Sequence, residues 1–520
     1  MSKARRPIPI TFWRTPCVRS PNWPAVAEAE VGGASVVVNR PGSELSRRRF
    51  PLWVGLALSV ATVGPTLAMA GNGQGLVAGV GKAVPLVFVI GLVGVSLVGY
   101  SFVRLTRHLN HAGSAYALVG ATIGPRAGFF AGFAMLGAYI SFCIGTLALT
   151  AIFTNAFLAE LQRGNPDPYQ LPWLVPILIA GALSLRLTGR DARVLAKILL
   201  AIEGVGIAAM IVLSAVIITR GGAAPTGVDF SVFSTSGVSV AAVLGGVVAA
   251  FLCWAGFEAC VSMGEETADP QRNIPRALIG TLALTGVLFV VVMFAQTIGF
   301  GTDAAGLKAF AGSENSLGEL SDRYIGEAFS LLISFTAVVG AFGCHMATGA
   351  ISGRLLYAFA RDGLGPPALA RIDLRTGSPQ RASWSVVAVA VMVSAVSGST
   401  LSMGGSAATS TYFVFGVAGS VCLMVCYLLV ELAALWFTAA PRFASVHGGA
   451  GRLAGVALPA AGAVVITVVV WFSVKDAGDW RDPPMLGLYW CAIGAAVALG
   501  ASGVAGRVGK SLAAEVELLR

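Results

Sequence analysis

The sequence predicts an all-α polytopic membrane protein with twelve transmembrane helices. Of its 520 residues, 56% are hydrophobic and only 12% are charged, about half the charged share of a typical soluble domain. Apolar runs of about 20 residues recur along the chain, and each is long enough to cross a hydrocarbon core of about 30 Å. One integrated helical bundle in the lipid bilayer is therefore expected, rather than a set of soluble domains.

Residues 1–50 precede the first apolar run and are predicted to form a basic, disordered cytoplasmic arm. They carry nine Lys and Arg against three Glu, together with Pro, Gly and Ser, and such a composition buries too little apolar surface to fold alone. No apolar h-region marks a cleavable signal peptide in this stretch. The predicted spans then follow at 51–72, 83–103, 126–160, 171–188, 192–219, 238–265, 276–300, 324–360, 382–400, 411–438, 453–474 and 485–506.

The basic residues predict the orientation. Twelve spans place both termini on one side, and with that side inside, 28 of the 35 Lys and Arg fall in cytoplasmic segments and 7 outside. Cytoplasmic loops of membrane proteins carry such an excess. We therefore expect cytoplasmic N- and C-termini in a cell membrane protein, and we attribute the net charge of +10 to topology rather than to nucleic-acid binding.

Two spans contain interruptions near their centres. The first holds Gly64-Pro65, and the sixth holds Ala255-Gly256. If the first ten spans form two halves of five, at 51–220 and 238–438, these breaks occupy equivalent positions in halves of opposite topology. Paired breaks in inverted repeats indicate a transporter site near the bilayer midplane. Helices 11 and 12 then occupy 453–506, and 507–520 form a cytoplasmic tail.

Three motifs resemble the amino acid–polyamine–organocation (APC) permeases. "GEETADPQRNIPRA" (264–277) resembles the segment that follows helix 6 in that family, and "SGRLLYAFARDGLGPP" (352–367) resembles its helix 8 ending. "GSAYALVGATIGPRAGFFAGF" (113–133) resembles the segment leading into helix 3. The resemblance covers roughly residues 51–440. It implies the leucine-transporter fold, alternating access, and a substrate site between helices 1, 3, 6 and 8.

The broken helices supply the predicted substrate site. Backbone freed by a break is tolerated in a membrane only where it faces protein or a cavity, and a helix N-terminus suits a carboxylate. We expect the substrate carboxylate near Val63, Gly64 and Thr66 and its ammonium at carbonyls around Cys253–Ala255. Pro65 departs from the glycine-rich family pattern and removes one amide. The predicted substrate-binding residues are Val63, Gly64, Thr66, Tyr139, Cys253, Trp254, Ala255, Gly256 and Phe257.

Aromatic residues near the breaks are candidate gates. Trp254 and Phe257 flank the second break and would shape the side-chain pocket, favouring small or medium apolar substrates. Ordinary packing or lipid contact is the alternative for both. Tyr139 matches a tyrosine of helix 3 in the family and would line or close the site, the alternative being an interhelical hydrogen bond.

Two acidic residues inside predicted spans are candidates for ion coupling. Glu203 lies about 18 Å into the fifth predicted span (192–219) at 1.5 Å per residue. Glu258 follows the break in the sixth predicted span (238–265). Ionisable residues in a membrane mark functional sites by default, so a proton is the expected coupling ion. The structural alternative for each is a protonated carboxyl bonded to a neighbouring helix.

Acidic and basic residues at the inner face predict a gate. Glu265 and Glu266 are expected to face Arg354, Arg361 or Arg104, either as a cytoplasmic gate or as a scaffold. The alternative is a solvated loop.

Together these features predict a secondary active amino acid transporter that works by proton symport. An exchanger, or a polyamine or organocation transporter of the same fold, is the alternative, and a non-transporting membrane sensor is a third. Enzyme motifs such as His-Glu-x-x-His, Gly-x-Ser-x-Gly and the Walker glycine loop are absent from the sequence. No cofactor, metal or nucleic acid is expected as a partner; the expected partners are a small amino acid or amine substrate and the lipid bilayer.

Overall fold

The computed structural model describes residues 29–31, 34–36 and 50–518, apart from 110, 112, 166, 189–191, 226, 236, 314, 374–376, 401–405, 441–451 and 476. The chain divides into two units, Met1–Ser43 and Glu44–Arg520. In the first unit, strands β1 (Ala29–Val31) and β2 (Ala34–Val36) pair in antiparallel register, with Ala29 opposite Val36. The rest of the predicted basic arm lies outside the described residues.

The second unit is helical, as predicted. Ten apolar segments of its described part are long enough to cross a membrane. The shorter apolar helices α7 (Leu174–Leu187) and α9 (Val240–Cys253) lie in two further predicted spans. The total of twelve membrane crossings and the inverted repeat stay predictions. The unbroken helices in predicted spans are α4 (Val84–Thr106), α6 (Pro125–Leu161), α7 (Leu174–Leu187), α8 (Ala192–Thr219), α10 (Pro270–Phe300), α13 (Glu327–Arg361), α14 (Gln380–Thr400), α15 (Ala407–Ala439), α16 (Arg452–Val474) and α17 (Pro483–Gly500).

The first predicted break lies at Gly64. Helix α1 (Leu52–Val63) ends there and α2 (Pro65–Gly71) begins one residue later. Gly64 has φ of 57° and ψ of 65°, a left-handed conformation that glycine adopts without a Cβ clash. Pro65 takes the first position of α2, where its missing amide breaks no helical hydrogen bond. The chain bends again at Asn72 before α3 (Gly73–Val80).

The second predicted break follows Cys253. Helix α9 (Val240–Cys253) ends there, and after a non-helical turn the chain forms the 3₁₀ helix η4 (Ala259–Met263). Gly256 in the turn has φ of 97°. A Cβ on this glycine would lie 2.3 Å from Thr62 Cγ2 of α1. The two breaks therefore approach each other through a contact that only glycine permits.

This contact predicts the effect of a Gly256→Ala substitution. We expect a loss of about 3 kcal/mol of stability, because alanine at positive φ is strained and its methyl group overlaps Thr62. Gly75→Ala on α3 is the matched control, since nothing lies within 4 Å of its added Cβ. Thermal unfolding of both variants in detergent checks this expectation. Equal melting temperatures would contradict the described contact between the breaks.

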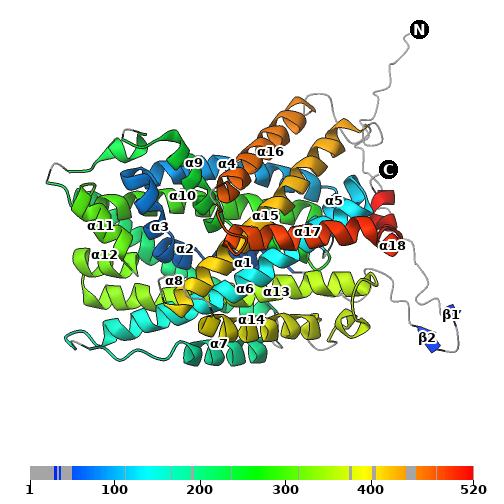
Figure 1. Cartoon of the computed structure of the whole chain (residues 1–520), viewed down its shortest axis with the longest axis horizontal. Coiled ribbons are helices and arrows are strands. Elements are labelled where there is room, and N and C mark those ends of the chain that lie inside the picture. Colours follow the sequence, from blue (N-terminus) through cyan, green and yellow to red (C-terminus); the bar gives the residue numbers. More distant parts are fainter. Residues whose placement is uncertain are drawn as a thin grey trace, which may run out of the picture. The chain divides into compact units, whose positions relative to one another are not determined.

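The long helices pack around these breaks. Helix α6 packs against both α13 and α15 near the middle of the bundle, and α13 also contacts α1 and α2 (Figure 1). Short helices lie at the ends of the bundle: α11 and α12 at one end, and α5 and α18 at the other (Figure 1). Hydropathy did not predict these connecting helices, whose bounds are Ala115–Thr122 (α5), Ala304–Gly312 (α11), Ser316–Tyr324 (α12) and Ser502–Leu518 (α18). The 3₁₀ helices η2 (Gly81–Ala83), η3 (Phe230–Phe233) and η5 (Pro367–Ala370) complete the unit.

Candidate functional site

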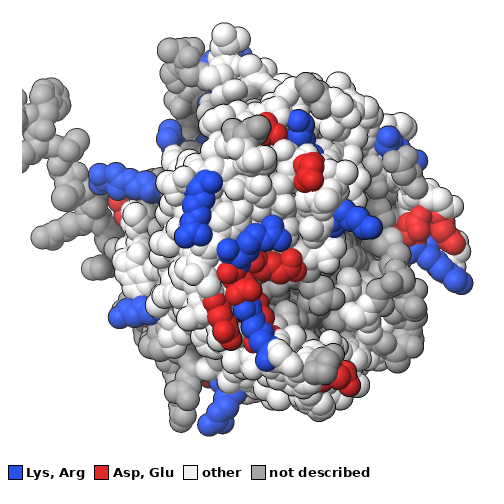
Figure 2. All heavy atoms as spheres, turned by 90° about the vertical axis from the view of Figure 1, so that its left-hand side faces the viewer, with Lys and Arg blue, Asp and Glu red and all other residues white. Residues whose placement is uncertain are grey.

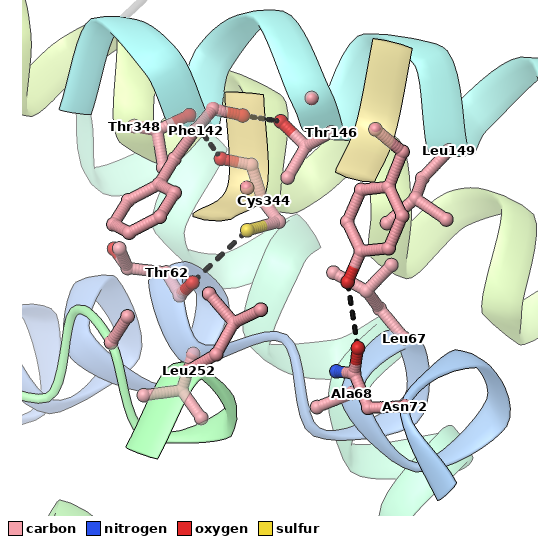
Figure 3. A pocket seen from close by; sticks show the side chains of 15 residues that line it. Thr62, Leu67, Ala68, Asn72, Phe142, Thr146, Leu149, Leu252, Cys344 and Thr348 are labelled. Carbon is pink, nitrogen blue, oxygen red and sulfur yellow. Dashed lines mark hydrogen bonds between the residues drawn. The ribbon is translucent and has the colours of Figure 1, made fainter. Parts of the chain in front are cut away.

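A small cavity of about 50 Å³ lies where the two breaks meet α6, α13 and α15 (Figure 3). Val63 lines it from the first break and Ala255 from the second. Both broken helices thus contribute to the lining of one cavity. The other lining residues are Thr62, Leu67, Ala68, Asn72, Phe142, Gly145, Thr146, Leu149, Leu252, Cys344, Thr348, Tyr412 and Gly416.

The lining of this cavity is apolar with a few neutral polar groups. The hydroxyls of Thr146 and Thr348 donate to backbone oxygens within their own helices, at 2.7 and 2.8 Å. The Tyr412 hydroxyl of α15 donates to Asn72 Oδ1 at 2.7 Å and so joins α15 to the bend between α2 and α3 (Figure 3). None of the lining residues is Asp, Glu, Lys or Arg. The cavity therefore suits a ligand with an uncharged side chain, because burying an unpaired charge is costly.

Several of the predicted site residues do not line the cavity. The Trp254 ring packs between Phe88 and Phe289, with ring centroids 5.6 and 5.4 Å away. Phe257 packs against Phe102 and Tyr427 instead. Their gating role stays a hypothesis, since both side chains are buried in aromatic contacts here. The predicted residues that do not line this cavity are Gly64, Thr66, Tyr139, Cys253, Trp254, Gly256 and Phe257.

Asn72 and Tyr412 were not predicted from the sequence. The two residues are 340 positions apart in the sequence, and no motif marks either of them. Thr146 and Thr348 on α6 and α13 were also missed. A hydroxyl inside an apolar span is common, because it can bond to its own helix, so it gives no signal by itself.

The carboxyl of Glu203, a residue of α8, lies beside the start of α2, next to the first break. Its Oε2 accepts a hydrogen bond from Thr66 Oγ1 at 3.2 Å, and its Oε1 has no hydrogen-bond partner among the described residues. Glycine makes room for it, since a Cβ on Gly340 of α13 would lie 2.8 Å from Oε1. The carboxyl thus sits between α8, α2 and α13. The N-terminal end of α2, where we expected a substrate carboxylate, faces a carboxyl of the protein itself.

Glu258 joins the second break to α6 and α15. The Tyr139 hydroxyl donates to its Oε1, and the Tyr427 hydroxyl donates to its Oε2 at 2.6 Å. All three side chains are buried. Two tyrosine hydroxyls thus donate to the carboxyl of Glu258, whereas Glu203 accepts from one hydroxyl, that of Thr66. For Tyr139, the geometry is that of an interhelical hydrogen bond, one of the two roles expected for it.

A third buried carboxyl inside a predicted span, that of Glu431 of α15, was missed. The Ser101 hydroxyl donates to its Oε2, and its Oε1 has no hydrogen-bond partner within the described part of the chain. That oxygen lies against α16, where a Cβ on Gly462 would approach it to 2.4 Å. An acidic residue inside an apolar run is a signal by which Glu431 could have been identified from the sequence.

The predicted ion pairs form at the end of the bundle that carries α5 and α18. Arg354 Nε lies 3.1 Å from Glu266 Oε1, and Arg361 Nη1 lies 3.3 Å from Glu265 Oε2. All four side chains belong to what we call the Glu–Arg cluster, and the solvated-loop alternative does not fit their burial. Arg104, the third expected partner, instead lies against α16 near Gly455.

The Glu–Arg cluster also fixes the start of α1. Phe50 N donates to Glu266 O at 2.7 Å, and Ala268 N donates to Phe50 O at 2.8 Å. Asp362, next to Arg361, accepts hydrogen bonds from Tyr116 of α5 and from Ser511 of α18. The chain entering the first broken helix is therefore bonded to the turn that follows the second.

His111 extends the cluster outside the membrane-spanning helices. Arg361 Nη2 lies 2.7 Å from its Nε2, and Gly113 N donates to its Nδ1 at 2.9 Å. Burial lowers the pKa of His111 most strongly; Glu265 and Asp362 oppose this, and Arg361 adds to it. A group with a lowered folded pKa stabilises the fold above its unfolded pKa and loses this contribution as the pH falls.

We therefore expect acidification to loosen this end of the bundle. As the pH falls below about 6.5, the usual pKa of histidine, thermal stability is expected to drop, by at most about 1.4 kcal/mol per pH unit for one proton. His111→Gln, which cannot titrate, is expected to flatten that part of the profile. Melting temperatures from pH 8 to pH 5 check this. An unchanged slope in the variant would assign the effect to other groups.

The opposite end of the bundle carries a second polar network. Arg163 Nη1 and Asp322 Oδ1 lie 2.5 Å apart, and Ser334 Oγ bonds to both Asn315 and Glu160, at 2.6 and 2.8 Å. These contacts tie the end of α6 to α12 and α13. Figure 2 shows acidic and basic side chains gathered on this face beside a hollow.

Several known proteins are similar to this chain. A 25% identical relative is the branched-chain amino acid permease of Lactococcus lactis subsp. cremoris (strain MG1363), matched over 65% of this chain and 74% of the relative. The low-affinity putrescine importer of Escherichia coli (strain K12) is 24% identical over 54% of this chain and 60% of that protein. A solved structure of a Na+-coupled sialic acid symporter in a substrate-bound outward-open state covers 81% of this chain and 90% of its own, with a TM-score of 0.47 and 12% identity.

The family match covers most of the chain. The sequence profile described as "Amino acid permease" matches residues 51–496. That range contains both broken helices, the cavity between them and the Glu–Arg cluster. The family is one of transporters and not of enzymes, in keeping with the multi-pass architecture. The chain therefore belongs to the amino acid permease family.

Proposed function

We propose that this permease transports neutral amino acids with small or medium apolar side chains by alternating access. The observation that carries the proposal is the cavity at the two breaks, whose lining contains hydroxyl, amide and apolar groups but no charged side chain. A polyamine or a cationic amino acid would need a buried acid to balance its extra charge. The branched-chain amino acid permease among the relatives agrees with this substrate class.

The two parts of a zwitterion would find different partners in this site. Backbone N–H and C=O groups left unpaired at the breaks would bind its carboxylate and ammonium. Lipid cannot form hydrogen bonds with these backbone groups, whereas a buried ligand can. Its side chain would extend toward Leu67, Leu149 and Leu252. Asn72 and Tyr412 close the cavity between α2 and α15, which makes their hydrogen bond the contact that substrate entry must open.

Alternating access would use the polar contacts at the two ends of the bundle in turn. Opening one end requires the Glu–Arg cluster to separate from the start of α1, and opening the other requires α12 to leave α6. The breaks at Gly64 and Gly256 allow the half-helices to move separately. From the distribution of Lys and Arg among the loops, we place the Glu–Arg cluster and both termini on the cytoplasmic side of the cell membrane. Twelve crossings with a five-plus-five inverted repeat complete this proposal.

We assign proton coupling to Glu203. It bridges the half-helix α2 and the long helix α13, and its second oxygen lacks a partner among the described residues. A proton on that oxygen would lower the cost of burying the carboxyl, and its release would favour a conformation in which water reaches α2. Glu258, with two tyrosine donors, is proposed to fix the second break in place.

A thermal-shift panel of the twenty amino acids and several polyamines tests the substrate class. A ligand that binds only the folded protein raises its melting temperature, so neutral aliphatic amino acids are expected to stabilise the permease and polyamines to leave it unchanged. Ala255→Val, which narrows the cavity, should reduce this stabilisation. Ala242→Val, earlier on α9 and away from the cavity, is the matched control. Stabilisation by putrescine or arginine alone would favour the amine alternative.

A further inference from the structure

A second hollow lies on the outside of the bundle, between α4 and α10. It is a groove of about 520 Å³. Ile279 and Val287 on its rim are 52% and 66% exposed, so in a membrane the groove faces lipid. Its apolar part is formed by Leu92, Val103, Ile279, Leu282, Ala283 and Val287.

The two helices of the groove are neighbours that run in opposite directions, as two close contacts show. A Cβ on Gly286 of α10 would lie 2.4 Å from Leu92 of α4, and one on Gly99 of α4 would lie 2.3 Å from Leu282 of α10. These close contacts fix the register of the pair. The end of α4 at Thr106 therefore lies beside the beginning of α10, at the same end of the bundle as the Glu–Arg cluster.

That end of the groove is basic. Tyr100, Arg104 and Arg107 line it, and none of its lining residues is acidic. Arg104 Nη1 donates to the Tyr100 hydroxyl at 3.2 Å, and the guanidinium rests against α16, where a Cβ on Gly455 would lie 2.6 Å from its Cζ. Arg104 is thus held in position by two neighbours. Arg107, three residues later on the same helix face, is exposed.

We propose that this groove binds an anionic phospholipid, with one acyl chain along the apolar wall and the phosphate between Arg104 and Arg107. Arginine pairs strongly with phosphate oxygens through parallel N–H donors. Basic pockets between transmembrane helices bind anionic headgroups, whereas the ammonium of a zwitterionic headgroup would weaken the attraction. The lipid is a ligand additional to the transported substrate, and its binding does not depend on which amino acid the central cavity takes.

Native mass spectrometry of the full chain tests this proposal. In detergent with equal amounts of phosphatidylglycerol and phosphatidylcholine of identical acyl chains, we expect selective retention of phosphatidylglycerol by the monomer. Arg107→Gln is expected to lower that retention about fivefold, since one arginine near an anionic headgroup accounts for roughly that factor. Arg381→Gln, an exposed arginine at the start of α14, is the matched control and should leave retention unchanged.

Two further experiments distinguish a bound phospholipid from other possible ligands of the groove. Ala283→Trp, which fills the apolar wall, is expected to lower retention of phosphatidylglycerol while both arginines remain. Glycerol 3-phosphate, which carries the charge without acyl chains, is expected to leave the melting temperature unchanged. Equal retention of the two lipids, equal loss in the Arg107 and Arg381 variants, stabilisation by glycerol 3-phosphate alone, or a lipid-free dimer would each overturn the proposal.

Discussion

Replacing Glu203 by Gln is expected to abolish proton-driven accumulation of substrate while leaving exchange of substrate across the membrane intact. The neutral amide keeps the size of the side chain and still accepts the hydrogen bond from Thr66. It cannot bind and release a proton. A coupled transporter would thus become a facilitator, and accumulation under an imposed pH gradient should fall by more than about tenfold, the factor that corresponds to 1.4 kcal/mol.

The measurement is uptake of labelled substrate into proteoliposomes, with and without a pH gradient, beside counterflow in the same preparation. Glu327→Gln is the matched control, because Glu327 is exposed at the start of α13. If Glu203→Gln keeps the pH dependence of the unmodified protein, Glu203 is a structural carboxyl and coupling must be sought elsewhere. Loss of counterflow as well as accumulation would instead indicate that Glu203 positions α2 for binding.

Arg354→Gln is expected to destabilise the protein by about 3–5 kcal/mol. Arg354 and Glu266 are 8% and 6% exposed, and removing one partner of a buried pair leaves the other charge unbalanced. Because the backbone of Glu266 also bonds to Phe50, the start of α1 should loosen together with the pair. We therefore expect both a lower melting temperature and faster proteolysis or labelling near Phe50.

The double substitution Arg354→Gln with Glu266→Gln separates these effects. It removes both charges and permits a neutral hydrogen bond, so most of the lost stability should return. If the single variant melts at the same temperature as the unmodified protein, the pair contributes little and cannot act as a closing contact. If the double variant is no more stable than the single one, the loss comes from packing of the Arg354 side chain.

The breaks in the first and sixth spans could be predicted because they depend on local chemistry. Gly64 and Gly256 both adopt positive φ, which glycine tolerates and other residues rarely do. The ion pairs of the Glu–Arg cluster were also predictable, since each partner belongs to a motif of the family. In both cases a short segment of sequence specifies the feature.

The lining of the cavity could not be predicted in the same way. The Tyr412–Asn72 contact depends on how α15 is rotated relative to the bend after α2, and a span that is apolar on all sides carries no signal for its rotation. The orientation of Trp254 and Phe257 depends on the turn around Gly256, which directs them toward α4, α10 and α15. Helices α11 and α12 are short and not apolar enough for hydropathy to detect.

Uptake into proteoliposomes containing only this protein tests whether it transports neutral amino acids together with protons. An inside-alkaline pH gradient, in the absence of sodium, is expected to drive accumulation of labelled leucine above its external concentration. Excess unlabelled neutral amino acid should compete, and putrescine should not. Binding of leucine without any flux, accumulation only with a sodium gradient, or transport of putrescine in place of leucine would contradict a proton-coupled permease for neutral amino acids.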